Sequence, residues 1–202
     1  MKILLLGGYF SSGKTTILVR LAEAMLKQEK RVCIIGNEGG TPAADDLLRK
    51  RENVEISTIQ GGCVCCQATG SLIEALNRIA KEIAPDWVLI ELTGIAFQDS
   101  VRYAIADYVH GDHSVIAATV VDAFRWKKLL KAVEPVVTRQ IQGADIVVVN
   151  KIDQNPDFSA IVQQIAAISD SSILLPMQAT EATGETLLEV LDQQRQKKEI
   201  RR

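Results

Sequence analysis

The sequence has little net charge, no long hydrophobic segment and no internal repeat. Its 202 residues carry 23 lysines and arginines against 25 aspartates and glutamates, and the formal net charge of -2 argues against a nucleic-acid-binding surface. The opening MKILLLGG is too short to span a membrane and lacks a small-residue cleavage site, so we expect a cytoplasmic protein without membrane association. No low-complexity stretch or linker marks a second domain, and residues 1–202 are expected to form a single domain.

Cysteine is also scarce, yet three of the four cysteines lie in GGCVCC, residues 61–66. In a reducing cytoplasm, such a cluster favours metal binding or redox chemistry over a structural disulfide. Cys33 lies inside an apolar segment, and we interpret it as a small buried side chain.

Short apolar segments alternate with stretches of helical periodicity. Because the apolar segments are hydrophobic throughout, they favour a parallel sheet that is covered on both faces by helices. The sequence therefore predicts an α/β, doubly wound, mainly parallel sheet flanked by helices, with ligands at the carboxyl ends of its strands. Strands are expected at 2–6, 32–36, 54–58, 87–91, 114–121, 145–150 and 171–176, and helices at 14–29 and 71–84 among others.

The first predicted strand runs into GGYFSSGKTT, which contains the P-loop pattern G-x-x-x-x-G-K-[ST]. Backbone N–H groups of such a loop, with the positive end of the following helix, point at phosphate oxygens. Lys14 is expected to reach the β- and γ-phosphates, and the Thr15 hydroxyl to hold Mg²⁺. An ordinary glycine-rich turn does not explain a lysine and two threonines at these offsets. The predicted nucleotide-binding residues are Gly8, Ser11, Ser12, Gly13, Lys14, Thr15 and Thr16.

A second motif, DIVVVNKID, indicates the base. Asn150, Lys151 and Asp153 give the N-K-x-D signature of GTPases at the end of an apolar strand. A carboxylate can accept hydrogen bonds from both N1–H and the 2-amino group of guanine, and adenine offers no such pair of donors. The backbone around Ala179 resembles the loop that meets the guanine carbonyl in many GTPases. These residues predict binding of GTP and GDP.

Together the motifs resemble the GTPase domain of the CobW family, relatives of the nickel-inserting GTPases of hydrogenase and urease maturation. The resemblance rests on the P-loop, GNEGG with a later aspartate, GGCVCC, LIELTGIA, VVDA and ADIVVVNKID. It implies a P-loop NTPase fold and a metal ion bound near the nucleotide by Cys63, Cys65 and Cys66. It also implies that Asp45, matching an aspartate of the family's first switch, binds Mg²⁺ directly or through water.

The residues themselves support a metal site at GGCVCC. Thiolates suit zinc, Cu(I) and some cobalt or nickel sites, and three sulfurs leave a fourth tetrahedral position, for which Glu38 is our candidate. A transferable metal ranks first, with zinc ahead of cobalt or nickel. A redox switch ranks second and a structural metal third.

The remaining catalytic candidates follow the strand at 87–91. Glu91 ends this strand as a Walker-B acid would and is predicted to hold Mg²⁺ with Thr15 and Asp45, while Gly94 offers a backbone N–H to the γ-phosphate. The predicted catalytic residues are Lys14, Asp45, Glu91 and Gly94. No arginine finger or water-orienting glutamine is evident near ELTG, so hydrolysis is expected to be slow without a partner.

The chain departs from the family pattern at several places. Thr41 replaces a second carboxylate, and Gln98 replaces a proline in what we expect to be a mobile segment. We expect no C-terminal CobW-type domain, so that client recognition uses the GTPase domain or another polypeptide.

The sequence is best interpreted as a GTPase that couples nucleotide state to metal binding or delivery. Its expected partner is a client metalloprotein or a cofactor-bearing enzyme, and a GTP-dependent homodimer is a further arrangement to test. Three alternatives stay open: a P-loop small-molecule kinase, a thiol-based metal or redox sensor, and a GTPase that activates a corrinoid or methyl-transfer enzyme.

Overall fold

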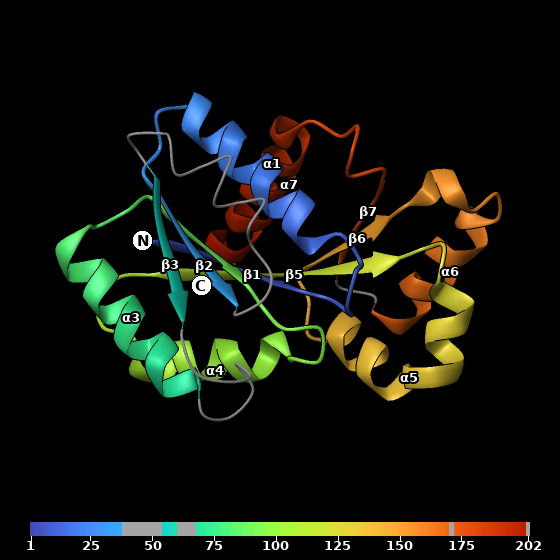
Figure 1. The fold of residues 1–202 in the computed structure, drawn as a ribbon, viewed down its shortest axis with the longest axis horizontal. Helices are drawn as coiled ribbons and strands as arrows, with labels where there is room; N and C mark the ends of the chain where they lie inside the picture. The colour runs from blue at the N-terminus through green and yellow to red at the C-terminus, as the bar shows by residue number, and fades with distance from the viewer. Residues whose placement is uncertain (38–53, 60–67, 170–171, 201–202) are drawn as a thin grey trace.

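The computed structural model describes residues 1–37, 54–59, 68–169 and 172–200. Within these residues, seven parallel strands form one sheet in the order β3-β2-β4-β1-β5-β6-β7 (Figure 1). Each predicted strand lies within two residues of an observed strand at both ends, and the predicted fold class is confirmed. The strands are β1 (Lys2–Gly7), β2 (Val32–Asn37), β3 (Val54–Ile59), β4 (Trp87–Glu91), β5 (Ser114–Asp122), β6 (Ile146–Asn150) and β7 (Ile173–Met177).

Helices cover both faces of the sheet. Helices α1 (Lys14–Lys27) and α7 (Gly184–Ile200) pack on one face (Figure 1). The opposite face is covered by α3 (Ala68–Glu82), α4 (Gln98–Tyr108), α5 (Trp126–Gln142) and α6 (Phe158–Ile168). A short 3₁₀ helix, η1 (Ile152–Gln154), follows β6.

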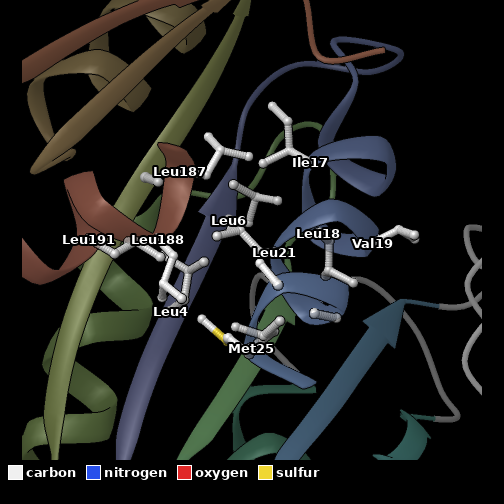
Figure 2. Close-up of a cluster of buried hydrophobic side chains, with 14 of the residues drawn as sticks. Leu4, Leu6, Ile17, Leu18, Val19, Leu21, Met25, Leu187, Leu188 and Leu191 are labelled. Atoms are coloured by element: carbon white, nitrogen blue, oxygen red, sulfur yellow. The ribbon is translucent and has the colours of Figure 1, made fainter. Parts of the chain in front are cut away.

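Strand β1 shows why the strands are apolar throughout. Successive side chains of a strand point to opposite faces, so Leu4 and Leu6 pack against α1 and α7 (Figure 2). Ile3 and Leu5 pack on the other face, in the cluster that includes α3 and α4. Cys33 joins this second cluster and is buried, which confirms its interpretation as a core side chain.

Helix α5 is bent. Pro135 lies within it, and the backbone at Val133 leaves helical geometry with φ -146° and ψ 33°. Proline removes one helical hydrogen bond and crowds the preceding turn, which accounts for the bend. The segment after the bend carries Gln140, a buried side chain that reaches the loop after β4.

The parallel arrangement gathers the predicted motifs at one edge of the sheet. The P-loop follows β1, the ELTG segment follows β4, and NKID follows β6. Strands β4, β1, β5 and β6 are consecutive neighbours, so their carboxyl ends meet side by side. Among the helices of the described ranges, none is long and apolar enough to cross a membrane.

Candidate nucleotide-binding site

The loop between β1 and α1 depends on two glycines. Gly8 has φ 128° and Gly13 has φ 105°, a region that favours glycine. A Cβ at Gly8 would overlap the Val120 carbonyl oxygen, and a Cβ at Gly13 would overlap the Asn150 amide. The backbone at both positions therefore requires the absence of a side chain.

Five successive carbonyl groups of this loop accept hydrogen bonds from side chains. Carbonyl and amide groups of one peptide plane point in opposite directions, so holding a carbonyl also orients the next N–H group. This arrangement suits a loop whose amides face an anion. The donors are Lys14 to Gly8 (3.0 Å) and Tyr9 (3.5 Å), Arg125 to Phe10, Lys151 to Ser11 (2.8 Å) and Asn150 to Ser12 (2.8 Å).

Lys14, Thr15 and Glu91 come together at the start of α1, as the sequence predicts. The Thr15 hydroxyl lies 3.0 Å from each carboxylate oxygen of Glu91. Only 7% of Lys14 and 9% of Glu91 is exposed. Burial lowers the pKa of the Lys14 ammonium, although the charge of Glu91 acts in the opposite direction. Burial likewise raises the pKa of the Glu91 carboxyl, against the effects of Thr15 and Lys14.

These groups fit a magnesium–nucleotide complex. Hydroxyl and carboxylate oxygens are the ligands that Mg²⁺ uses in proteins, and Thr15 and Glu91 supply both. The Ser12 and Thr93 hydroxyls are buried without a hydrogen-bond partner among the described residues. Buried hydroxyls normally have hydrogen-bond partners, so these two hydroxyls at the carboxyl edge of the sheet are consistent with a polar ligand there.

Asn150 joins the P-loop to the second motif. Besides donating to Ser12, its side chain accepts hydrogen bonds from the Lys151 N–H at 2.8 Å and the Ala179 N–H at 2.9 Å. Lys151 adopts a left-handed backbone with φ 62°, which is costly for a residue other than glycine. Asp153 lies in η1 with an exposed side chain. Its contact with guanine stays a prediction.

Gly94 lies against the P-loop. A Cβ at Gly94 would meet the Phe10 ring at 2.5 Å, so the ring packs directly on this backbone. Gln140 donates from Nε2 to the carbonyl oxygens of Gly94 at 3.1 Å and Ala96 at 3.0 Å. Gln140 was not predicted as a site residue. The sequence signal that could have indicated it is a polar residue next to the buried Ile141, on a helix face that is otherwise apolar.

Gln98 corrects an expectation. We expected it in a mobile segment, but its side chain is fully buried. It donates to the Ala118 carbonyl at 3.3 Å and to the Thr119 hydroxyl, which itself donates to the Gln140 carbonyl at 2.7 Å. A Cβ at Gly7 would overlap Gln98, so this glutamine fits only beneath a glycine.

Asp122 and Arg125 are site residues to which the sequence analysis assigned no role, although VVDA contains Asp122. The Asp122 side chain is completely buried, and its Oδ2 lies 2.7 Å from both Lys151 Nζ and Arg125 Nε. Burial raises the pKa of Asp122, but the hydrogen bonds from Lys151 and Arg125 outweigh it and hold the pKa below its usual value. Asp122 is therefore an ionised carboxylate shared by two cations.

The predicted transition-metal site lies outside the described residues. Its proposed ligands Glu38, Cys63, Cys65 and Cys66 belong to residues 38–53 and 60–67. Asp45, the predicted Mg²⁺ ligand, and Thr41 lie outside the described residues as well. In the part of the chain that the structure does describe, no group of three histidine, cysteine, aspartate or glutamate side chains could hold a metal ion.

Comparison with known proteins gives the chain a family context. The model of the CobW/HypB/UreG nucleotide-binding domain matches residues 2–174. The zinc chaperone YeiR of Escherichia coli is 28% identical over 152 residues, which cover 74% of this chain and 46% of YeiR. The zinc chaperone YjiA of the same organism is 26% identical over 190 residues, covering 83% of this chain and 54% of YjiA. The chain thus spans about half the length of these relatives.

A solved structure supports the same fold. The crystal structure of the hydrogenase maturation factor HypB from Archaeoglobus fulgidus superimposes with a TM-score of 0.70 at 17% identity. The match covers 95% of this chain and 89% of the HypB chain.

Proposed function

This chain belongs to the CobW/HypB/UreG family of nucleotide-binding domains, and on that premise we propose that it binds and hydrolyses GTP to control a transition metal. Residues 1–202 would act as one GTPase domain. The metal is cargo, received and then passed to a client metalloprotein or cofactor-bearing enzyme in the cytoplasm. Zinc ranks first because YeiR and YjiA are zinc chaperones, and nickel or cobalt follow.

The observation that carries GTP binding is the position of Asn150. One buried side chain bonds to Ser12 in the P-loop, to the adjacent Lys151 and to Ala179. Phosphate and base motifs separated by more than a hundred residues therefore occupy one continuous edge. A small-molecule kinase has no need of NKID at this place, whereas guanine recognition explains Asp153.

Hydrolysis would be organised by the groups around Thr15. Lys14 would neutralise charge on the β- and γ-phosphates, and the Gly94 N–H would face the γ-phosphate. Thr15 and Glu91, together with Asp45, would hold Mg²⁺, which when bound supplies positive charge at the phosphate oxygens. Lys14 and Glu91 are each buried at a cost, and the bound nucleotide and cation would offset that cost.

The cargo site would be formed by Cys63, Cys65 and Cys66, with Glu38 as the fourth ligand. Three thiolates and a carboxylate match the tetrahedral preference of zinc. Asp45, a proposed Mg²⁺ ligand, lies in the segment 38–53 with Glu38, and the three cysteines lie in the segment 60–67. Because these segments begin at the carboxyl ends of β2 and β3, a change of nucleotide would alter the metal site. GTP-dependent pairing of two copies is a further part of this proposal.

Base preference tests the proposal. Asp153→Ala should weaken GDP binding at least about tenfold and leave ADP binding unchanged, because the lost hydrogen bonds involve a charged carboxylate. Calorimetric titration of both nucleotides would measure this. Asp157→Ala is the matched control, since Asp157 is also exposed and lies four positions further along the chain. Equal affinity of the wild type for GDP and ADP would refute guanine recognition.

A further inference from the structure

Two carbonyl groups at the tip of the P-loop are held by cations that share one carboxylate. Arg125 donates from Nη2 to the Phe10 carbonyl, and Lys151 donates to the Ser11 carbonyl at 2.8 Å. Both cations lie 2.7 Å from Asp122 Oδ2. One buried aspartate at the end of β5 thus links the loop to two cations, one of which belongs to NKID.

The guanidinium of Arg125 makes its two contacts in fixed directions. Nε donates to Asp122 while Nη2 donates to Phe10, and the backbone N–H of Arg125 also donates to Asp122 Oδ1 at 3.0 Å. A planar guanidinium has donors at set angles, so fixing one end on Asp122 determines where the other end points. A lysine would keep the charge without this geometry.

Holding the Phe10 carbonyl determines the orientation of the next amide. The peptide bond is planar and trans, so the Ser11 N–H points away from the carbonyl that Arg125 holds. The Phe10 ring is restrained as well, because it packs edge-to-face on Tyr9 at 5.3 Å and lies against Gly94. Phe10 is therefore held at both its ring and its carbonyl group, and the peptide that joins it to Ser11 is fixed in orientation.

We propose that Arg125, oriented by Asp122, is a positioning residue for phosphate binding, and that Asp122 couples the phosphate loop to the guanine motif. Arg125 turns the Ser11 amide toward the nucleotide phosphates. Asp122 places Arg125 and Lys151 together, so that the phosphate and base contacts are set by one carboxylate. This inference rests on the proposed function, namely that the site binds a guanine nucleotide.

The chain offers a matched control for Arg125. Arg102 pairs with Asp145, and its side chain is 31% exposed, as is that of Arg125 in its pair with Asp122. Arg102 lies in α4 and takes no part in the P-loop contacts described above. Replacing either arginine by alanine removes a partly buried ion pair. Only Arg125→Ala also removes a hydrogen bond to the P-loop.

The test is calorimetric titration of GDP and ADP into the wild type and four variants, each checked by thermal denaturation. Arg125→Ala should weaken GDP binding about fivefold or more, as expected when a charge-assisted hydrogen bond is lost. The ratio of GDP to ADP affinity should not change. Arg125→Lys should bind as weakly as Arg125→Ala, and Arg102→Ala should bind as the wild type does. Asp122→Asn should lose both affinity and base preference, because it releases Lys151 as well.

Several outcomes would overturn the inference alone. In each of them the wild type prefers GDP to ADP. The inference fails if Arg125→Ala binds GDP as tightly as the wild type, or if Arg125→Lys recovers the full GDP affinity. It also fails if Arg102→Ala loses as much GDP affinity as Arg125→Ala. A change of base preference in Arg125→Ala would also contradict it. Arg125→Ala decides the matter even if Asp122→Asn does not fold. A wild type that binds neither nucleotide would instead refute the proposed function, and this inference with it.

Discussion

Lys14, Thr15 and Glu91 show how individual residues prepare the site for its ligand. A buried ammonium and a buried carboxylate both lose hydration, and for each of them burial is the largest influence on its pKa. Their opposite charges compensate for this loss only in part. We infer that these residues are retained for binding and catalysis at some cost to the stability of the ligand-free protein.

Glu91→Gln tests this inference through pH. The folded-state pKa of Glu91 is raised above the unfolded value, so the folded protein binds this proton more tightly than the unfolded chain does. Ionisation of Glu91 therefore lowers stability as pH rises from the unfolded pKa through the folded one. Glu91→Gln should gain stability relative to the wild type across this interval, whereas Mg²⁺-dependent GTP hydrolysis should slow about ten- to a hundredfold.

Urea denaturation of the nucleotide-free proteins at a series of pH values from 4 upward would measure the first effect, and phosphate release the second. A stability difference that did not vary with pH would show that Glu91 titrates normally. Hydrolysis at the wild-type rate would remove Glu91 from the catalytic assignment while leaving the P-loop assignment intact.

At the scale of elements, the packing of α7 on α1 positions the turn that holds Ala179. Gly184 begins α7, and a Cβ there would overlap the Arg20 carbonyl of α1. Arg20 in turn donates to the Thr180 carbonyl at 3.0 Å. The exposed ion pair of Lys27 with Glu185 adds little, because solvent screens it. The close backbone contact at Gly184 therefore lets the two helices approach at a distance that a side chain there would prevent.

A pair of glycine substitutions tests this contact. Gly184→Ala should destabilise the protein by about 1–3 kcal/mol, because the added methyl group forces α7 away from α1. Gly70→Ala is the control: Gly70 lies in α3, nothing surrounds its Cβ position within 4 Å, and alanine there should stabilise by about 0.5–1 kcal/mol. Urea denaturation would measure both. A neutral Gly184→Ala variant would show that the helices separate without cost.

At the scale of the whole molecule, the proposed function requires the nucleotide site and the cysteine cluster to affect one another. Residues 38–53 follow β2 in the chain and residues 60–67 follow β3, so each of these two segments begins at the carboxyl end of its strand. A ligand that binds two states of a protein with different affinity must shift the balance between those states. Reciprocity follows, because the coupling free energy is shared by both ligands.

Metal titration of the reduced protein tests this coupling. Zinc affinity should differ about fivefold or more between the GTP-bound and GDP-bound forms, and zinc should change GTP affinity by the same factor. Uptake should release protons and weaken in acid, because zinc and protons compete for the thiolates of Cys63, Cys65 and Cys66. Competition with a chromophoric chelator would give the affinities.

Two variants control this measurement. Replacing Cys65 and Cys66 with serine should abolish sulfur-to-metal charge-transfer absorption in the cobalt form and leave GDP binding intact. Cys33→Ala should retain the absorption, because Cys33 is buried in the core. Identical zinc affinities with GTP, with GDP and without nucleotide would make the site structural or redox-active and remove the case for GTP-driven delivery.

The amino-acid sequence determined the features that depend on neighbouring residues. Continuous apolar segments place a strand between two helical layers, so all seven strands were predicted closely. The P-loop and NKID were also evident, because the glycines, Lys14 and Thr15 act within a few positions of one another. Asn150 and Lys151 lie at the predicted edge for the same reason, as each follows directly from its own strand.

Tertiary structure alone decided which distant residues meet. Arg125 and Lys151 reach Phe10 and Ser11 from a shared Asp122 because β5 lies between β1 and β6, an order that no local pattern specifies. The burial of Gln98 and Gln140 could not be predicted locally either, because the carbonyl groups that accept hydrogen bonds from their Nε2 atoms belong to other segments of the chain. Motifs and strands depend on consecutive residues and can be recognised in the sequence, whereas these contacts follow from the free energy of packing the whole sheet and its helices together.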